Sequence, residues 1–297
     1  MGIADELLDA ARCGSFRLSD AFPYIGDTLY LPKPMVAADA FDAQNRAREA
    51  RGERMDSRER KANKKLAYIP AASYPSYLAG TFDALAALES FELGKASLQA
   101  RVNLTRADGG DALPFFVGGY SFASDAGLYF ISSGTYDLEP LLEQLSYSGL
   151  GGKRTSGYGR FEFCVQGDNP LAQVKRRGSQ QAQARQKGKS KRSKRRAAAQ
   201  TAQASQPKTH VLLSSAIPTS DELTDAFLKG ARYKLIHRGG FVQSTSHGST
   251  PQKKRDMYLF AAGSTFERKF EGDVFDVNAT LGSHPVWRYA KAMWAEV

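Results

Sequence analysis

The stretch GLGGKRTSGYGRFEF, residues 149–163, places five glycines and three basic residues between a predicted helix and an alternating apolar run. Glycine lets successive backbone N–H groups point into one concavity without interference from Cβ atoms. Lys153, Arg154 and Arg160 stand beside these amides, and cationic side chains neutralise phosphate groups. The stretch therefore predicts a loop that binds the phosphate backbone of a nucleic acid.

Two nucleotide-binding loops do not fit this spacing. A P-loop requires Ser or Thr after its lysine and an earlier glycine where Tyr147 stands, but Arg154 follows Lys153. A Rossmann turn places its glycines between a strand and a helix, whereas these glycines precede the alternating residues 161–165, a pattern typical of a strand.

Residues 156–163 partly match the aromatic RNA-binding strand of RRM domains. Gly157, Tyr158, Gly159 and Phe163 fit that pattern, and Ser156, Arg160 and Phe161 do not. The alternative is a flexible hairpin connection without a ligand.

Composition indicates a globular protein whose nucleic-acid surface is local. The 297 residues, 42% of them hydrophobic, suffice for two modest domains, and the net charge is +10. Residues 175–196 contain 11 basic residues and no acidic one, which leaves 30 basic against 31 acidic residues elsewhere. An RNA-binding surface on the folded part must therefore be a patch.

The sequence does not indicate a metal site, a disulfide framework or a membrane-spanning segment. Cys13 and Cys164 show no paired spacing, and the four histidines are scattered, so we expect neither a metal nor another cofactor. The N-terminus lacks a basic leader with an apolar core, and no apolar run reaches membrane-spanning length. We expect a cytoplasmic protein that does not contact a membrane.

Periodicity predicts an α+β protein with two domains joined by a basic linker. The expected helices are 3–12, 76–88, 137–147 and 219–229, the last beginning at a capping box of Thr219 and Glu222. The expected strands are 29–31, 98–104, 113–122, 127–132, 161–165, 211–213, 232–243, 257–262, 272–277 and 286–294. The predicted domains are 1–170 and 208–297, and the low-complexity segment 171–207 is the predicted flexible linker.

Six segments carry a resemblance to a known family: 16–24, 31–34, 64–70, 127–130, 151–159 and 239–242. With them the chain resembles the fourth Csm subunits of type III-A CRISPR effector complexes, members of the RAMP superfamily. The glycine loop marks only the superfamily, whereas the segments 19–23 and 31–34 narrow the resemblance to this subunit family.

The resemblance implies two RRM-like or ferredoxin-like domains and a non-catalytic role. Such a subunit binds the 5′ handle of the guide RNA (crRNA) and joins the large polymerase-like Csm subunit to the backbone RAMP subunits. The implied RNA contacts are Gly149, Gly151, Gly152, Lys153, Arg154, Thr155, Ser156, Gly157, Tyr158, Gly159 and Arg160 in the loop, with Ser19, Asp20, Phe22, Pro23 and Lys33 elsewhere. Ser19 and Asp20 equally fit a local role, because Ser and Asp beside turns bond to backbone groups.

One departure concerns the start of the chain. Members of the family begin with a β-strand and a His-Ser-Asp-Thr-like segment before the helix at 3–12, and neither occurs here. We therefore expect the first domain to lack its N-terminal strand, through a misplaced start or because a partner supplies the strand.

Two other functions remain open at this point. Some RAMP proteins are endoribonucleases that process precursor guide RNA, and His247 in the polar loop 244–256 is the candidate general acid or base. A stand-alone RRM-like regulator would instead bind short single-stranded RNA by stacking bases on aromatic side chains.

Overall fold

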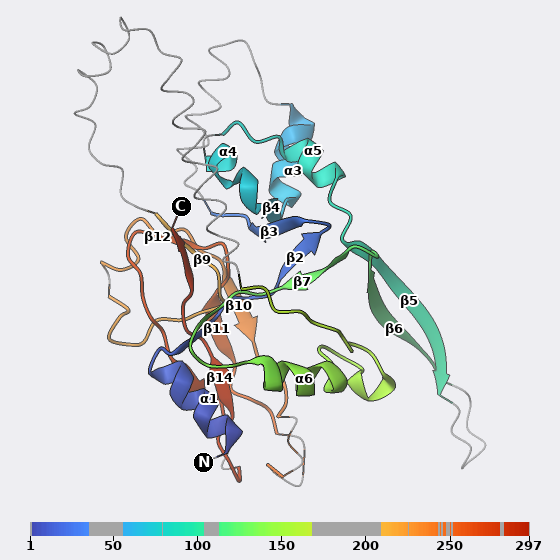
Figure 1. Ribbon diagram of the computed structural model, residues 1–297, viewed down its shortest axis with the longest axis vertical. Coiled ribbons are helices and arrows are strands. Elements are labelled where there is room, and N and C mark those ends of the chain that lie inside the picture. Colours follow the sequence, from blue (N-terminus) through green and yellow to red (C-terminus); the bar gives the residue numbers. More distant parts are fainter. Residues whose placement is uncertain are drawn as a thin grey trace, which may run out of the picture. The chain divides into compact units, whose positions relative to one another are not determined.

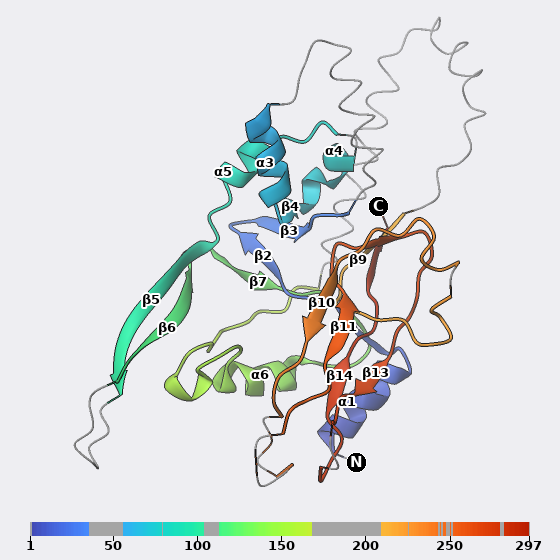
Figure 2. The same cartoon turned by 180° about the vertical axis from the view of Figure 1, so that it is seen from behind.

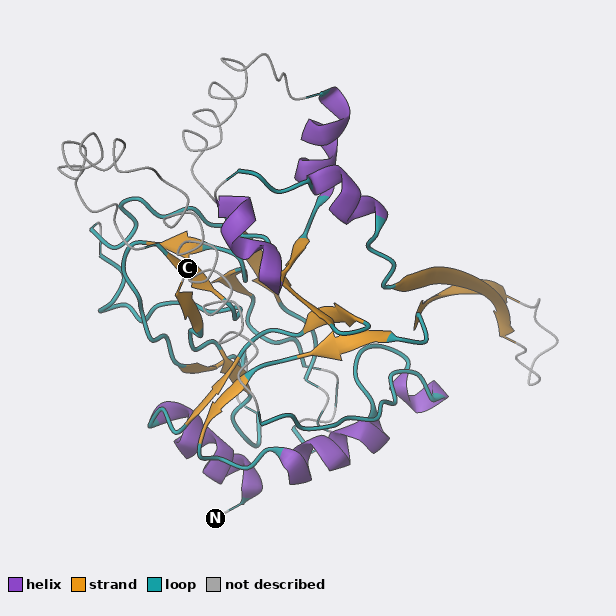
Figure 3. Cartoon of the chain, turned by 45° about the horizontal axis from the view of Figure 1, so that its top comes forward, coloured by secondary structure: helices purple, strands orange, loops and turns teal. Residues whose placement is uncertain are grey.

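The computed structural model describes residues 2–35, 56–103, 113–167 and 209–296, apart from residues 79, 225, 243, 245, 248, 249, 251, 280 and 281. Short helices and small antiparallel sheets of two to four strands form these parts, consistent with the predicted α+β class (Figures 1 and 3). The count of two RRM-like domains stays a prediction. The predicted linker 171–207, including the basic tract 175–196, lies outside the described residues.

Contacts divide the chain into two units that are not consecutive in sequence. The first unit comprises Met1–Asp20 and Ile131–Glu296, and the second is the continuous run Ala21–Phe130. This grouping differs from the predicted sequential division at 170 and 208. The reason is that β1 (Phe16–Leu18) pairs with β8 (Ser132–Gly134), which joins the start of the chain to its later part.

The second unit is built on a sheet of four antiparallel strands in the order β4-β3-β2-β7. The strands are β2 (Phe22–Ile25), β3 (Thr28–Pro32), β4 (Tyr68–Pro70) and β7 (Ala126–Tyr129). Its helical segments are α3 (Ser57–Lys65), the 3₁₀ turn η1 (Ala71–Ser73), α4 (Tyr74–Leu78) and α5 (Ala84–Glu89). The helix predicted over 76–88 is thus two helices, because Asp83 caps a new one by accepting from the N–H groups of Leu85 and Ala86.

A long two-stranded ribbon belongs to the same unit. Strands β5 (Gly94–Asn103) and β6 (Leu113–Phe122) pair over ten residues and extend away from the helices of that unit (Figure 1). The predicted strands 98–104 and 113–122 are confirmed in place, whereas the turn predicted between them lies outside the described residues.

Helix α1 (Ile3–Arg12) covers one side of the first unit. Its Ala10 and Ala11 are buried with Phe16 of β1 and with Val274 of β13 (Val274–Asp276), and the ring of Tyr289 packs against this cluster. Tyr289 lies on β14 (Trp287–Tyr289), which pairs with β13 beside the helix (Figure 2). The helix predicted over 3–12 is confirmed.

An aromatic core holds the rest of the first unit. Strand β9 (His210–Leu212) lies between β12 (Thr265–Phe266) and β15 (Trp294–Glu296), and β10 (Leu235–Arg238) pairs with β11 (Met257–Phe260). Phe260 of β11 and Phe266 of β12 pack together with the buried rings of Phe227 and Phe270.

The helix predicted over 219–229 is wrong for the described residues, although one half of its capping box forms. The Glu222 carboxylate accepts hydrogen bonds from the N–H and hydroxyl of Thr219, at 2.9 and 3.2 Å. The same carboxylate accepts from the backbone N–H groups of Glu271 and Gly272, at 2.7 and 3.1 Å. These distant partners bind the turn to another segment, and the chain continues through turns.

Candidate nucleic-acid interface

The glycine loop follows α6 (Glu139–Ser148), which confirms the helix predicted over 137–147. Gly149 N–H caps the helix by donating to Leu145 O at 2.7 Å, and Leu150 N–H closes the neck of the loop by donating to Gly159 O at 2.8 Å. Gly149 and Gly159 have φ values of 77° and 76°, in the left-handed region. A Cβ atom on Gly159 would lie 1.8 Å from Leu150 O, so the neck requires glycine there.

The crest of the loop is open. A Cβ atom on Gly151, Gly152 or Gly157 would meet no atom within 4 Å. Between them, residues Arg154–Ser156 form the 3₁₀ turn η2, with Ser156 N–H donating to Lys153 O at 2.9 Å. The backbone of Gly151, Gly152 and Thr155 donates no backbone hydrogen bond within the described residues. Exposed donors of this kind suit an anion.

Three basic residues belong to this loop. Lys153 has φ 55°, a left-handed conformation uncommon outside glycine, and it immediately precedes Arg154. Lys153 and Arg160 are exposed and Arg154 is half-buried. Thr155, Ser156 and the half-buried Tyr158 complete the loop, so the structure brings all eleven predicted loop residues together.

The strand predicted over 161–165 is wrong for the described residues. Residues 160–167 pair with no other described strand, and Phe163 and Val165 are 39% and 60% exposed. Phe161 and Phe163 keep the alternation that suggested a strand, with ring centroids 6.5 Å apart. The apolar alternation is present, but a β-strand also needs a neighbouring strand with which to exchange backbone hydrogen bonds.

Ser19 and Asp20 bind segments that are distant in the sequence, and Ser19 also bonds to local backbone. Ser19 is 5% exposed, and its hydroxyl accepts from Ile131 N–H at 2.8 Å and donates to Asp20 O at 2.7 Å. The Asp20 carboxylate accepts from the N–H and the hydroxyl of Ser215, at 2.8 and 2.6 Å. Both side chains hold segments of the first unit together, which opposes the predicted RNA contact.

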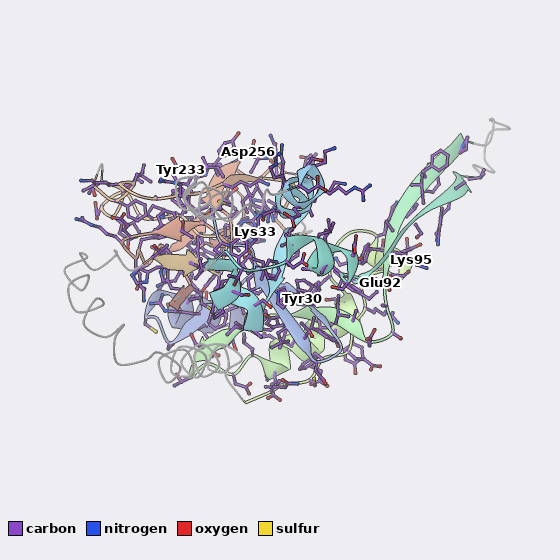
Figure 4. The ribbon with its side chains drawn as sticks, turned by 90° about the horizontal axis from the view of Figure 1, so that it is seen from above. Tyr30, Lys33, Glu92, Lys95, Tyr233 and Asp256 are labelled. Atoms are coloured by element: carbon purple, nitrogen blue, oxygen red, sulfur yellow. The ribbon has the colours of Figure 1, made fainter. Side chains whose placement is uncertain are left out.

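The remaining predicted contacts belong to the second unit. Phe22 and Pro23 are fully buried, with the Phe22 ring against Tyr129, so these side chains form core, and their contact with RNA stays a prediction. Lys33 (Figure 4) is not freely presented, because its ammonium donates to Asn63 O. Burial lowers the pKa of Lys33.

His247 is buried, not exposed as its polar loop suggested. It is 3% exposed, its Nε2 lies 3.2 Å from Asn278 Oδ1, and its ring is 4.7 Å from that of His284.

Within the described residues, no three His, Cys, Asp or Glu side chains gather as metal ligands. No helix of the described part is long and apolar enough to cross a membrane.

Sequence reasoning missed the apolar face of the β5–β6 ribbon. The pairing sets Leu98 opposite Gly118 and Ala100 opposite Phe116, and alternation puts the following side chains on one face: Ala96, Leu98, Ala100, Val102, Phe116, Tyr120 and Phe122. Leu98 and Phe116 are 70% and 67% exposed. Lys95, at the base of the ribbon (Figure 4), and Ser97 lie on the other face. Alternation along each strand was the signal that could have revealed it.

Comparison with known proteins gives consistent matches along the chain. The profile of the CRISPR Csm4 C-terminal domain matches residues 205–297. A protein of Mycobacterium tuberculosis (strain CDC 1551 / Oshkosh), named CRISPR system Cms protein Csm4, is 33% identical over 99% of this chain and 83% of its own length. The Streptococcus thermophilus protein of the same name is 31% identical over 99% and 84%.

Two solved structures share the fold. A chain from the crystal structure of a Csm1-Csm4 cassette in complex with cA4 matches with a TM-score of 0.52 at 21% identity, covering 99% of this chain and 82% of that one. In a Csm3-Csm4 subcomplex of the type III-A interference complex, the match has a TM-score of 0.51 at 17% identity, covering 99% and 87%. The likenesses to these two structures show the fold, and the relatives that are 33% and 31% identical place the chain among the protein components of CRISPR systems. Within that class, the chain belongs to the Csm4 family.

Proposed function

We propose that this chain holds the 5′ handle of the guide RNA in a type III-A Csm effector complex. The glycine loop carries the proposal, because it combines open backbone donors at Gly151 and Gly152 with the cations Lys153 and Arg154. The chain acts as a structural subunit and catalyses no reaction.

The chain also joins the large polymerase-like subunit to the backbone RAMP subunits. Support comes from related Csm4 proteins, which were solved together with Csm1 and with Csm3. The ribbon face around Leu98 and Phe116 adds physical support, since a contiguous exposed apolar face marks a contact with another macromolecule.

The endoribonuclease alternative rests on His247. Its burial separates the imidazole from solvent, whereas a general acid or base must come within hydrogen-bond reach of the RNA. Incubation with repeat RNA in the absence of metal separates the two functions. A single discrete cleavage, lost in His247→Ala, would overturn the non-catalytic role.

The RNA-binding role is tested by replacing Lys153 and Arg154 together with Ala. We expect weaker binding to labelled handle RNA and a flatter dependence of log affinity on log salt, by about one for each phosphate that is no longer neutralised. Lys64→Ala with Lys65→Ala is the matched control, because these exposed residues lie at the end of α3 and their replacement changes the charge equally. If the loop variant kept the affinity for RNA and the salt slope of the wild type, the glycine loop would not be the RNA-binding site.

A further inference from the structure

The β10–β11 sheet carries a pair of exposed rings on one face. Its register sets His237 opposite Tyr258, and residues that lie opposite each other in an antiparallel pair point to the same face. The two ring centroids are 5.2 Å apart, and the ring planes are tilted by 49°. The His237 side chain is 52% exposed and Tyr258 is 59% exposed, so both rings are open to a ligand from solvent.

The same face is anchored in the core at its other end. Leu235 lies opposite Phe260, two residues from the ring pair along each strand. The Phe260 ring is buried and packs against Tyr233 and Phe266, at centroid distances of 4.8 and 5.1 Å. The face therefore passes from the aromatic core at Phe260 to solvent at Tyr258, and the core holds the strands that carry the exposed rings.

A carboxylate orients the histidine ring. Asp256 (Figure 4) places its Oδ1 3.2 Å from His237 Nε2 and its Oδ2 3.1 Å from Lys253 Nζ. A Cβ atom on Gly239 would lie 2.2 Å from Asp256 Oδ1, so glycine at this position leaves room for the carboxylate beside His237. The hydrogen bond from Lys253 lowers the pKa of Asp256, which keeps the carboxylate ionised at neutral pH.

The charge around the rings is mostly positive. Residues 230–262 contain six Lys and Arg residues and a single acidic residue, Asp256. Lys253 is exposed, and its ammonium has three N–H donors, of which the contact with Asp256 uses one. Positive charge beside exposed rings complements a polyanion that has planar apolar groups, and single-stranded RNA has both. An acidic protein surface would use the charge but leave the rings uncovered.

We propose that the His237–Tyr258 pair stacks on a base of single-stranded RNA, with Lys253 bound to a neighbouring phosphate. Aromatic rings accept any base, because every base has a π-face, so the contact holds RNA without reading its sequence. The inference rests on the proposed RNA-binding function, but it uses residues separate from the glycine loop.

Stacking is tested with the full chain and a labelled single-stranded RNA. Tyr258→Leu should weaken binding about tenfold and leave the salt slope unchanged, because stacking releases no counterions. Tyr258→Phe is the matched control, since it keeps the ring and removes only the hydroxyl group, and it should bind RNA as the wild type does. Equal RNA affinity in the two variants would overturn the proposal.

The phosphate contact has a different signature. Lys253→Gln should flatten the dependence of log affinity on log salt by about 0.7, the value for one phosphate of a single strand. Lys229→Gln removes the same charge from an exposed position of the same unit and should leave the slope unchanged. An unchanged slope in Lys253→Gln, or an equal change in both variants, would show that no phosphate is bound at Lys253.

Thermal unfolding separates a binding role of the rings from a structural one. Tyr258→Leu should keep the Tm of Tyr258→Phe, because the ring lies outside the core. His237→Leu repeats the comparison from β10 should Tyr258→Leu fail to fold. A lower Tm in these variants with unchanged RNA affinity would make the pair structural and overturn the proposal.

Other occupants of this face would give different results. Displacement of the RNA by an equal concentration of AMP would indicate a site for a free nucleotide and overturn the RNA assignment. Loss of a co-purifying protein subunit with unchanged RNA affinity would identify a protein contact and overturn it as well. Weaker binding only in the Lys153 and Arg154 variant would retain the glycine loop and reject the stacking pair, and weaker binding only in Tyr258→Leu would do the reverse.

Discussion

The glycines of the loop differ in how much open space surrounds their backbone. Gly149 and Gly159 are fixed by the closeness of neighbouring backbone, whereas Gly151 and Gly152 face open space. The first pair serves the shape of the loop, and the proposed RNA contact falls to the second pair, only a few residues away.

Gly152 is the position where these demands can be tested separately. Its φ lies outside the left-handed region, and a Cβ atom there meets nothing, so Gly152→Ala should fold normally. If RNA packs against this backbone, the methyl group should weaken binding by about 1 kcal/mol, roughly fivefold. A filter-binding titration measures the change. Gly167→Ala, equally unobstructed, is the control, and equal affinity for both variants would place the RNA elsewhere.

At the same scale, the sequence could predict the open loop but not the roles of Ser19, Asp20, Phe22 and Pro23. The loop is local, and its glycines and cations are consecutive. Asp20, in contrast, is satisfied by Ser215, which lies 195 residues away. The sequence does not show so distant a partner, so the side chain was predicted to bind RNA, whereas in the fold its oxygens accept hydrogen bonds within the protein.

Helices and strands were also predictable from the sequence where local interactions determine them, and not where distant contacts do. Helices α1 and α6 and the β5–β6 ribbon were predictable, because their periodicity and short-range pairing suffice. The segments 161–165 and 219–229 were not. The first needs a partner strand, and the second exchanges helical bonds for contacts with Glu271 and Gly272.

The turn at Glu222 gives a prediction for stability. Glu222→Gln should lower the free energy of unfolding by about 1–3 kcal/mol, since several N–H and hydroxyl donors lose a charged acceptor. Thermal denaturation measures it, with the exposed neighbour Asp221→Asn as control. A decrease in Tm equal to that of the control would show that the donors are satisfied without the charge.

The pH dependence of this contribution has a definite sign. Burial acts to raise the pKa of Glu222, but the hydrogen bonds from Glu271, Thr219 and Gly272 outweigh it and leave the pKa below the ordinary 4.5. A lowered folded pKa means that the stabilisation is complete above the unfolded pKa and is lost as pH falls through the folded value. The difference between wild type and Glu222→Gln should therefore shrink in acid.

On the scale of the whole molecule, the exposed ribbon suits a chain that works inside an assembly. One face is apolar over most of its length, and nothing among the described residues covers Leu98 or Phe116. In isolation such a surface favours self-association.

Leu98→Lys and Phe116→Lys should make the isolated chain more soluble and reduce its co-purification with partner subunits, because each places a charge on the apolar face. Static light scattering and a pull-down measure the two effects. Ser97→Lys adds the same charge to the opposite face and should change neither. If all three variants behave alike, net charge and not the apolar face governs association.

The discontinuous first unit also has a consequence for the order in which the protein is made. Residues Ala21–Phe130 leave the ribosome as one uninterrupted run and can fold while synthesis continues. Strand β1 must wait for β8, and β9 must wait for its neighbour β15, because both partners are translated much later. A ribosome that stops early would therefore release a chain with one finished unit and one that still exposes its aromatic core to the cell's proteases.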